Sequence, residues 1–483
     1  MPQRINHNNH KTDIDKEQLH RASVDNGLTH TAVISSKPHL LIYAHYYAPD
    51  TASTGQIIQD LAKGMLETFR VTVICVVPSY LGVIEEKWKT QKYYCENING
   101  VDVLRVAVPE FTKSNKKSRV KNILTYFFRA MKATGKVDKV DYVMSVSQPP
   151  ILGGLLGVWG KWRLKSNIGR HPHYIYQIQD FNPEQVLAVN YSKNKLITGL
   201  MMFLDKFSCK HADLVITVGR DLIETLNGRF AGKDGNPKEN FPKSVLINNW
   251  IDEKEIYPLP PDHPRIVKFK KRYNLMSKDG SEDKFVIMYS GNIGLYYDLE
   301  NLMKVIEKFK DVHTLPSALH PNGREVVFAF VGAGSVLDKL ILYKENHNLT
   351  NVIFIPYQDK ADLIYSLNAA DVHWCVNAKG IKGVSVPSKA YGIMAVGKPI
   401  LGVLDRGSEA RLLIEETGCG KCHRPGDYSG IEELVGWFIE HGESLDDGVG
   451  ELQRMGMKGR EYLVKNLTKE VSLAKYKAAI LKC

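Results

Sequence analysis

The sequence lacks the long apolar run that a membrane-spanning helix requires. None of its segments has 18 uninterrupted apolar residues, whereas a helix that crosses a bilayer needs about 20. Residues 1–37 are polar, rich in His, Asn and Lys, and without the apolar centre of a signal peptide. The sequence therefore predicts a chain that is neither exported nor membrane-spanning, with a disordered tail over residues 1–37 that has little to bury.

Cysteine is also scarce. The chain has 7 cysteines, an odd number at scattered positions, which does not resemble a disulfide framework and is typical of a reducing cytosol. The stretch Cys419 to His423, CGKCH, has the spacing of a haem attachment site. Such attachment requires export, and no signal peptide is visible, so this interpretation is disfavoured.

Acidic residues are missing from one basic stretch. Between Thr112 and Val137 the chain carries Lys and Arg but no Asp or Glu. The basic residues of a predicted helix here are Lys116, Lys117, Arg119, Lys121, Arg129 and Lys132, and its apolar face is expected to comprise Ile123, Leu124, Tyr126, Phe127 and Phe128. Basic amphipathic helices can lie on an anionic membrane surface. A solvated charged helix is an equal alternative, and nucleic-acid binding has no recognition motif to support it.

What is present is a globular composition with alternating strands and helices. The 483 residues are 43% apolar and carry a net charge of +11, which favours anionic partners. Buried-strand patterns separated by helical periodicity predict a doubly wound α/β fold. The strands are expected to start at His39 and to span residues 71–77, 101–108, 141–147, 174–178, 214–218, 245–252, 285–289, 326–331, 352–355, 371–376 and 399–403.

A Pro-, Lys-, Asp- and Ser-rich segment at residues 253–283 divides this series in two. We therefore expect two tandem Rossmann-like domains with an interdomain cleft where the loops at the carboxyl ends of both sheets converge. The predicted boundaries are a tail at 1–37, a first domain at 38–255, a second domain at 256–460, and a C-terminal helix at 461–483 that packs back on the first domain.

The stretch from Val384 to Pro399, VSVPSKAYGIMAVGKP, is the strongest candidate for a phosphate site. Pro387 sets a tight turn, Ser388 can cap a helix starting near Ala390, and Lys389 adds a positive charge beside the helix N-terminus. Such a combination suits a diphosphate whose charge grows as a bond to it breaks. An ordinary strand-to-helix turn is the alternative.

Other loops at predicted strand ends could face the same cleft. The loop Thr51–Gly55 supplies small residues and free amides before a helix expected at residues 56–66, Asp180 follows a strand of the first half, and Arg220 starts a helix. In the second half, the glycines of the loop Gly291–Gly294 let the backbone approach a phosphate. The GAGS loop at 332–335 lacks the full dinucleotide fingerprint, which makes an oxidoreductase a poor fit.

Six segments together resemble the GT-B glycosyltransferases, and among them the family-4 retaining transferases of bacterial capsule, colanic-acid and O-antigen assembly. They are YYAPDTASTGQIIQDLAKGM, YIYQIQDFNPE, VLINNWIDEKEIYPL, YSGNIGLYYDLENLM, SVPSKAYGIMAVGKPIL and GSEARLLIEETGCG, spread over residues 46–420 in the expected order. The resemblance implies that the second domain binds a nucleotide-diphosphate sugar and the first binds a polyprenyl-linked or saccharide acceptor.

The resemblance also implies roles for individual residues. Lys389 and Asp180 would be catalytic. The donor would be bound by Gly291, Asn292, Tyr357, Gln358, Lys382, Pro387, Ser388, Lys389 and Glu409, and the acceptor side would include Thr54, Gly55, Gln56 and Arg220. Many relatives have two glutamates where this chain has Val384 and Gly392, and a basic residue where it has Asn292, which shifts charge neutralisation toward Lys389, Lys382 or Arg220.

No metal and no cofactor are expected, because the only Asp-x-Asp pair, Asp13 and Asp15, lies in the tail. The resemblance implies retention through attack on the face from which the nucleotide leaves, so we name no nucleophile. The expected location is cytoplasmic and peripheral at the inner face of the plasma membrane, with no nucleic-acid partner. A nucleotide-sugar epimerase of the same fold and a non-catalytic sugar-nucleotide or membrane-binding protein are the alternatives.

Overall fold

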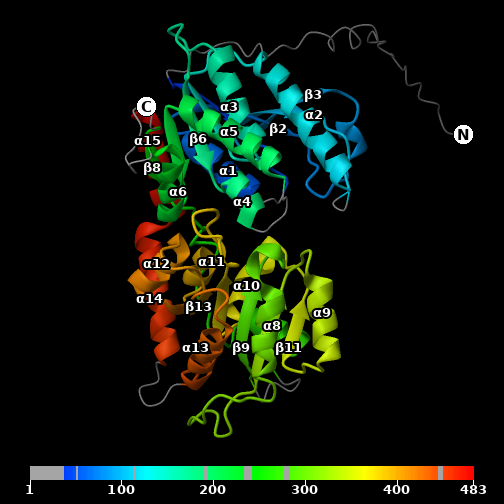
Figure 1. Ribbon diagram of the computed structural model, residues 1–483, viewed down its shortest axis with the longest axis vertical. Helices are drawn as coiled ribbons and strands as arrows, with labels where there is room; N and C mark the ends of the chain where they lie inside the picture. The colour runs from blue at the N-terminus through cyan, green and yellow to red at the C-terminus, as the bar shows by residue number, and fades with distance from the viewer. Residues whose placement is uncertain are drawn as a thin grey trace, which may run out of the picture.

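The computed structural model describes residues 37–50, 53–112, 115–188, 194–232, 242–276, 283–443 and 450–483. Residues 1–36 of the predicted tail, which include the Asp13–Asp15 pair, and the first residues of the TASTG loop lie outside these ranges. Two α/β domains follow each other along the long axis of the molecule (Figure 1). The predicted fold class, two tandem Rossmann-like domains, is confirmed.

The N-terminal domain is built on an eight-stranded sheet in the order β3-β4-β2-β1-β5-β6-β7-β8. All neighbouring strands are parallel except β3 and β4. Its strands are β1 His39–Tyr43, β2 Arg70–Val76, β3 Tyr93–Ile98, β4 Val101–Val106, β5 Tyr142–Val146, β6 His173–Ile178, β7 Leu214–Thr217 and β8 Ser244–Leu246. The central strand β1 is buried along its whole length because helices cover both sheet faces.

The C-terminal domain has a six-stranded, fully parallel sheet in the order β11-β10-β9-β12-β13-β14. Its strands are β9 Phe285–Ser290, β10 Val326–Val331, β11 Val352–Ile355, β12 Val372–Val376, β13 Ile400–Val403 and β14 Gly420–His423. Sequence patterns did not predict the edge strands β3 and β14. Their residues are exposed or only partly buried, so neither strand has a continuous apolar run.

Helices pack on both faces of each sheet. The α-helices are α1 Ser53–Met65, α2 Lys116–Thr134, α3 Leu152–Arg163, α4 Asn182–Ala188, α5 Lys195–His211, α6 Arg220–Phe230, α7 Pro264–Arg272, α8 Leu299–Glu307, α9 Leu337–Asn346, α10 Leu363–Asn368, α11 Lys389–Ala395, α12 Glu409–Thr417, α13 Tyr428–Glu440, α14 Glu451–Asn466 and α15 Lys469–Leu481. Three short 3-10 helices are η1 Glu86–Trp88, η2 Leu295–Tyr297 and η3 Lys360–Asp362. None of the described helices combines the length and apolar composition that a bilayer span requires.

The chain crosses between the domains twice. After β8 ends at Leu246, the rest of the predicted strand 245–252 runs toward the C-terminal domain. On the return, α14 packs on α11, and only α15 reaches the N-terminal core, where Tyr476 and Ile480 are buried and the Gln177 amide donates to the Tyr476 hydroxyl (2.5 Å). The predicted division at 460/461 therefore falls inside α14, and the chain changes domain near Leu467, which still packs in the C-terminal core.

The basic helix α2 differs from its predicted orientation. Tyr126, expected on the outer apolar face, is fully buried and donates a hydrogen bond to the carbonyl of Ala44 (2.9 Å). Phe127 packs against the core. Ile123 is partly buried, whereas Leu124 and Phe128 are exposed as predicted. With Val120 they form an exposed apolar stripe, spaced by four residues, that lines a shallow surface hollow of about 530 Å³ together with Lys116, Lys117 and Lys121.

Candidate active site

A cavity of about 180 Å³ lies between the two domains. Residues from both domains line it: Thr54, Ile57, Gln179, Asp180, Gln185 and Asn249 from the first, and Tyr296, Tyr297, Asn377, Ile381, Ser385, Val386, Pro387, Ser388 and Lys389 from the second. Most of these residues follow or flank the carboxyl ends of strands, where open parallel sheets bind ligands. Of the predicted site residues, the cavity brings together Thr54, Asp180, Pro387, Ser388 and Lys389.

The loops of the two domains meet directly beside this cavity. Asp180, two residues after β6, forms an isolated antiparallel bridge with Ser385, and the amide of Phe181 donates to the carbonyl of Val384 (2.9 Å). These contacts join the QDFNPE loop of one domain to the VPSK loop of the other. Two motifs separated by some 200 positions in the chain therefore share one wall of the cavity.

Lys389 is the cationic group of the cavity. Its Nζ lies 4.0 Å from the ring centre of Tyr297 and 4.9 Å from that of Tyr289. Burial lowers the pKa of Lys389 to about 8, and no described carboxylate forms an ion pair with it. Aromatic faces stabilise a cation without neutralising it, so the charge of Lys389 is available to an anionic ligand.

The helix start at Lys389 differs from the prediction. Ser388 occupies the N-cap position, but its side chain makes no capping hydrogen bond. The amides of Ala390 and Tyr391 approach the carbonyls of Pro387 (3.5 Å) and Ser388 (3.3 Å). The helix α11 has only 7 residues, so its dipole is short, and Lys389 itself is the main positive charge of this turn.

Gly291 shapes the space that Lys389 occupies. Its φ of +139° is a conformation that other residues rarely adopt, and a Cβ there would lie 2.8 Å from Cε of Lys389. The adjoining GAGS loop packs on the same backbone, because the Gly291 amide donates to the carbonyl of Val331 (2.9 Å) and a Cβ on Gly332 would meet the Gly291 carbonyl. Gly291 and the exposed Asn292 do not themselves line the cavity.

Asp180 is the carboxylate of the cavity. It is partly buried, and burial raises its pKa, while a hydrogen bond from the side chain of Ser385 opposes that shift. Its main-chain amide lies 3.4 Å from the Ser147 hydroxyl. A carboxylate in this position can accept a hydrogen bond from a sugar hydroxyl or take up a proton.

Glu409 and Arg220, predicted at the donor and acceptor sides, lie against each other outside the cavity lining. The buried Glu409 carboxylate accepts hydrogen bonds from the main-chain amide (2.8 Å) and Nε (2.9 Å) of Arg220, and from the Asn248 amide (2.9 Å). Arg220 also contacts Glu416 (2.6 Å). In this structure the pair joins the two domains and does not face the cavity.

Three further predicted donor residues lie outside the cavity lining. Tyr357 is 66% exposed, and the Gln358 side chain donates to the carbonyl of Pro356 (2.7 Å). Both follow β11, the edge strand of the sheet and two strands away from β9. Lys382 is exposed and pairs with Glu224 of the first domain (3.2 Å).

The predicted TASTG loop is largely the first turn of a helix. Because α1 begins at Ser53, Thr54, Gly55 and Gln56 are helical. Thr54 reaches the cavity, whereas Gly55 lies close to the main chain of Tyr46, where a Cβ would be 3.2 Å from the carbonyl oxygen. Gln56 is not among the lining residues.

Sequence reasoning missed the amide groups of the cavity. The buried side chains of Gln179 and Asn249 exchange two hydrogen bonds (2.8 and 3.2 Å), and Gln185 and Asn377 add further amides to the lining. The first two lie within the YIYQIQDFNPE and VLINNWID segments, but polar residues inside strand-end motifs carry no signal of their pairing. Tyr297, in contact with Lys389, was missed for the same reason.

The fold and the site define a class of protein. Two Rossmann-like domains, joined by a return of the C-terminal helix, enclose a polar cavity with a lysine on the second domain and a carboxylate on the first. This is the architecture of the GT-B glycosyltransferases, whose active sites lie between the domains.

Comparison with known proteins agrees with this class. Residues 272–460 match the family model described as glycosyl transferases group 1. The chain is 27% identical over 384 residues to the probable glycosyltransferase WbjE of Pseudomonas aeruginosa, covering 77% of this chain and 83% of that protein. It is 27% identical over 309 residues to the putative colanic acid biosynthesis glycosyl transferase WcaI of Escherichia coli K12, covering 62% and 66%.

Solved structures share the fold. Sucrose-phosphate synthase from Thermosynechococcus elongatus superposes with a TM-score of 0.67 at 12% identity, covering 92% of this chain and 99% of that one. Anabaena HepE in complex with UDP and glucose gives a TM-score of 0.61 at 12% identity, covering 92% and 100%. The chain has the GT-B fold, and residues 272–460 in its C-terminal half form a group 1 glycosyltransferase domain.

Proposed function

We propose that this glycosyltransferase moves a sugar from a nucleotide-diphosphate sugar to a polyprenyl-linked or saccharide acceptor in the synthesis of a bacterial surface polysaccharide. The observation that carries the proposal is the cavity lined by both domains, in which Lys389 is held against two tyrosine rings. The names of WbjE and WcaI support the polysaccharide context, and the UDP and glucose bound by HepE support a nucleotide-sugar donor.

In this mechanism Lys389 stabilises the departing diphosphate. The acceptor hydroxyl oxygen forms a bond to the anomeric carbon as the bond from that carbon to the diphosphate oxygen breaks, and the acceptor proton passes to the departing diphosphate. Negative charge grows on the diphosphate during this step, so a cation already in place lowers the barrier. Asp180 and the Gln179–Asn249 amide pair would orient the sugar and acceptor hydroxyls.

The proposal includes retention and independence of metal. Attack on the face from which the diphosphate leaves gives retention without a protein nucleophile. The described residues contain no group of three or more His, Cys, Asp or Glu side chains arranged to hold a metal ion. The charge of the diphosphate would then be balanced by Lys389 and by hydrogen-bond donors.

The enzyme would work on the cytoplasmic side, peripherally at the inner face of the plasma membrane. The support is α2, whose exposed residues Val120, Leu124 and Phe128 stand among lysines. Anionic lipid attracts such lysines, and apolar side chains beside them strengthen the contact.

The experiment is a transfer assay with a panel of nucleotide sugars, with and without lipid-linked acceptor. Consumption of the donor only when acceptor is present supports the transferase, with the anomeric configuration of the product read by NMR. Conversion of the donor to an epimer without acceptor would show the epimerase alternative, and binding without turnover would show a non-catalytic protein. A product with inverted anomeric configuration would refute only the retention part of the proposal.

A further inference from the structure

Helix α5 exposes a stripe of large apolar side chains, although it also packs Phe207 against the core. Its buried residues are Thr198, Asp205, Ser208 and Cys209, three of them polar. Its outward residues are Leu196, Ile197, Leu200 and Phe203, which are 84%, 52%, 58% and 65% exposed. A surface helix normally directs its apolar stripe to the core, so this outward stripe indicates an apolar partner.

The inward polar residues of α5 are fully satisfied. Asp205 accepts hydrogen bonds from the Tyr176 hydroxyl (2.8 Å) and from Nη1 of Arg229 (2.6 Å). The Ser208 hydroxyl donates to the Leu204 carbonyl (3.1 Å). The Ser208 bond lies within the helix, whereas the two bonds of Asp205 join α5 to β6 and α6. The bonds of Asp205 therefore hold the helix in this orientation, and its apolar stripe cannot turn inward without breaking them.

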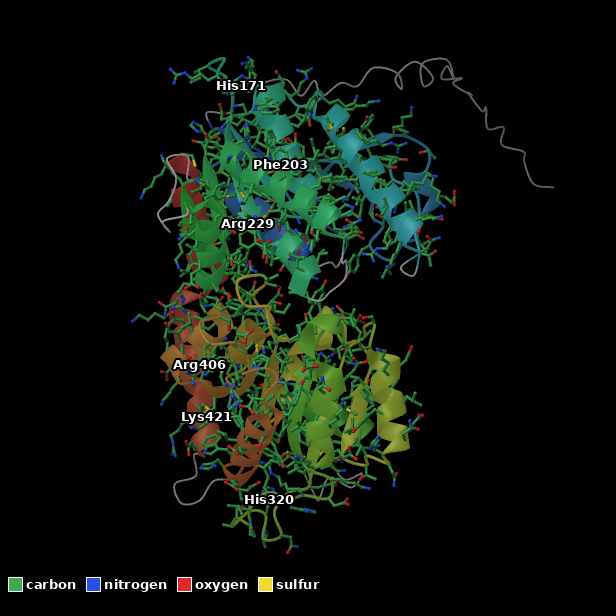
Figure 2. All side chains as sticks on the ribbon, in the orientation of Figure 1. His171, Phe203, Arg229, His320, Arg406 and Lys421 are labelled. Atoms are coloured by element: carbon green, nitrogen blue, oxygen red, sulfur yellow. The ribbon has the colours of Figure 1, made fainter. Side chains whose placement is uncertain are left out.

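The surroundings of this stripe are basic. α2, α3 and α5 pack side by side on one face of the N-terminal sheet (Figure 1), and Figure 2 shows Phe203 on that face. Within these three helices the only acidic residue is the buried Asp205. Lys195 and Lys210 of α5 are exposed, as are Lys116, Lys117 and Lys121 of α2. An apolar stripe framed by cations complements an anionic bilayer surface.

We propose that α5 is the main segment of this enzyme that inserts into the bilayer, while α2 supplies most of the electrostatic attraction. The inference rests on the membrane location in the proposed function and assigns a different task to each helix. α4, which contacts α5, carries Gln185 in the cavity lining. Insertion of α5 would therefore place the active site next to the membrane surface from which a lipid-linked acceptor extends.

The test measures binding to vesicles of phosphatidylglycerol and phosphatidylethanolamine at low salt and at about 0.5 M salt, where charge attraction is largely screened. The α5 variant carries Leu196→Ser, Leu200→Ser and Phe203→Ser, which change exposed residues only. The matched control carries Leu315→Ser, Leu319→Ser and Leu342→Ser, three exposed leucines of the C-terminal domain. The α2 variant carries Lys116→Gln, Lys117→Gln and Lys121→Gln.

We expect wild-type binding to persist in part at high salt, and the α5 variant to lose this salt-resistant part by about tenfold or more, since three apolar side chains no longer leave water. The α2 variant should lose binding mainly at low salt, and the leucine control should match the wild type. Equal high-salt binding of the α5 variant and the wild type would overturn the inference.

Two controls separate this inference from the proposed function. If wild-type protein ignores the vesicles but transfers sugar to a soluble acceptor, the membrane location fails and the transferase stands. If the α5 substitutions abolish a dimer in solution and leave vesicle binding unchanged, a second copy of the chain is the occupant of the stripe, and insertion is refuted.

Discussion

Replacing Lys389 with Ala removes the one cation that lines the described cavity. A phosphate oxygen hydrogen-bonded to an ammonium lies about 2.8 Å away. At an effective dielectric constant of about 20, two unit charges at that distance attract by about 6 kcal/mol. Only the part of this attraction that grows as the diphosphate departs lowers the barrier. Loss of one group that stabilises the transition-state charge costs about 3–4 kcal/mol. We therefore expect turnover to fall by about 100- to 1000-fold.

The same residue predicts a pH dependence of donor binding. The pKa of Lys389 is lowered to about 8 in the empty protein, and a bound diphosphate favours its charged form and raises that pKa. Donor affinity should therefore weaken as the pH rises above about 8, by up to about tenfold per pH unit. Burial raises the pKa of both Tyr297 and Cys375 to about 12, so neither neighbour titrates in this range.

The contribution of Lys389 to folding stability has the opposite pH dependence to its effect on donor affinity. The pKa of this lysine is lower in the folded protein, about 8, than its ordinary value of 10.5. Between these values the unfolded chain binds more protons, so the contribution of Lys389 makes the fold more stable as the pH rises through that window. Donor affinity and folding stability should thus change in opposite directions between pH 8 and 10.5.

The assay is steady-state transfer together with calorimetric titration of the donor between pH 7 and 9.5. The matched control is Lys379→Ala, at an exposed lysine between β12 and α11 that does not line the cavity. Lys389→Met should abolish the pH dependence. Near-normal turnover of Lys389→Ala would refute the role of Lys389 in stabilising the departing diphosphate. An unchanged pH profile in Lys389→Met would show that another group titrates.

Four other outcomes are expected. Gly291→Ala should lower turnover about 10- to 100-fold with the fold intact by circular dichroism, because its Cβ would displace Lys389; normal kinetics would contradict that packing. Tyr297→Leu should shift the pH profile of donor binding to lower pH, because it removes the ring next to the Lys389 cation, whereas Tyr297→Phe keeps the ring and should preserve the profile. Identical profiles for both variants would exclude a role of Tyr297 in positioning Lys389. Arg220→Ala should destabilise the protein by about 1–3 kcal/mol in denaturant titration, because the buried Glu409 loses the Nε donor and keeps only the main-chain amide and the Asn248 amide; a loss no larger than that of Glu416→Ala would count against this. Transfer should survive EDTA, and a full loss restored only by magnesium or manganese would disprove metal independence.

The alternation of apolar strands and amphipathic helices carried enough information to predict the fold class. Parallel strands buried on both faces, such as Val326–Val331, appear in the sequence as continuous apolar runs. The VPSK turn and the GNIG loop could be identified because few residues tolerate their backbone requirements. The edge strand Tyr93–Ile98 could not be predicted, because half-exposed strands lack such a run.

Tertiary structure alone decided which of these groups meet. Asp180 and Ser385 lie side by side only because the two domains are in contact. The ion pair between Glu409 and Arg220 forms for the same reason, since the two residues belong to different domains. Periodicity also could not orient α2 or α5. The buried side of each helix is selected by hydrogen bonds with distant strands: the Tyr126 hydroxyl donates to the carbonyl of Ala44, and the Tyr176 hydroxyl donates to the Asp205 carboxylate. Local sequence determines that a helix forms, whereas the partners across the core determine which of its faces turns outward.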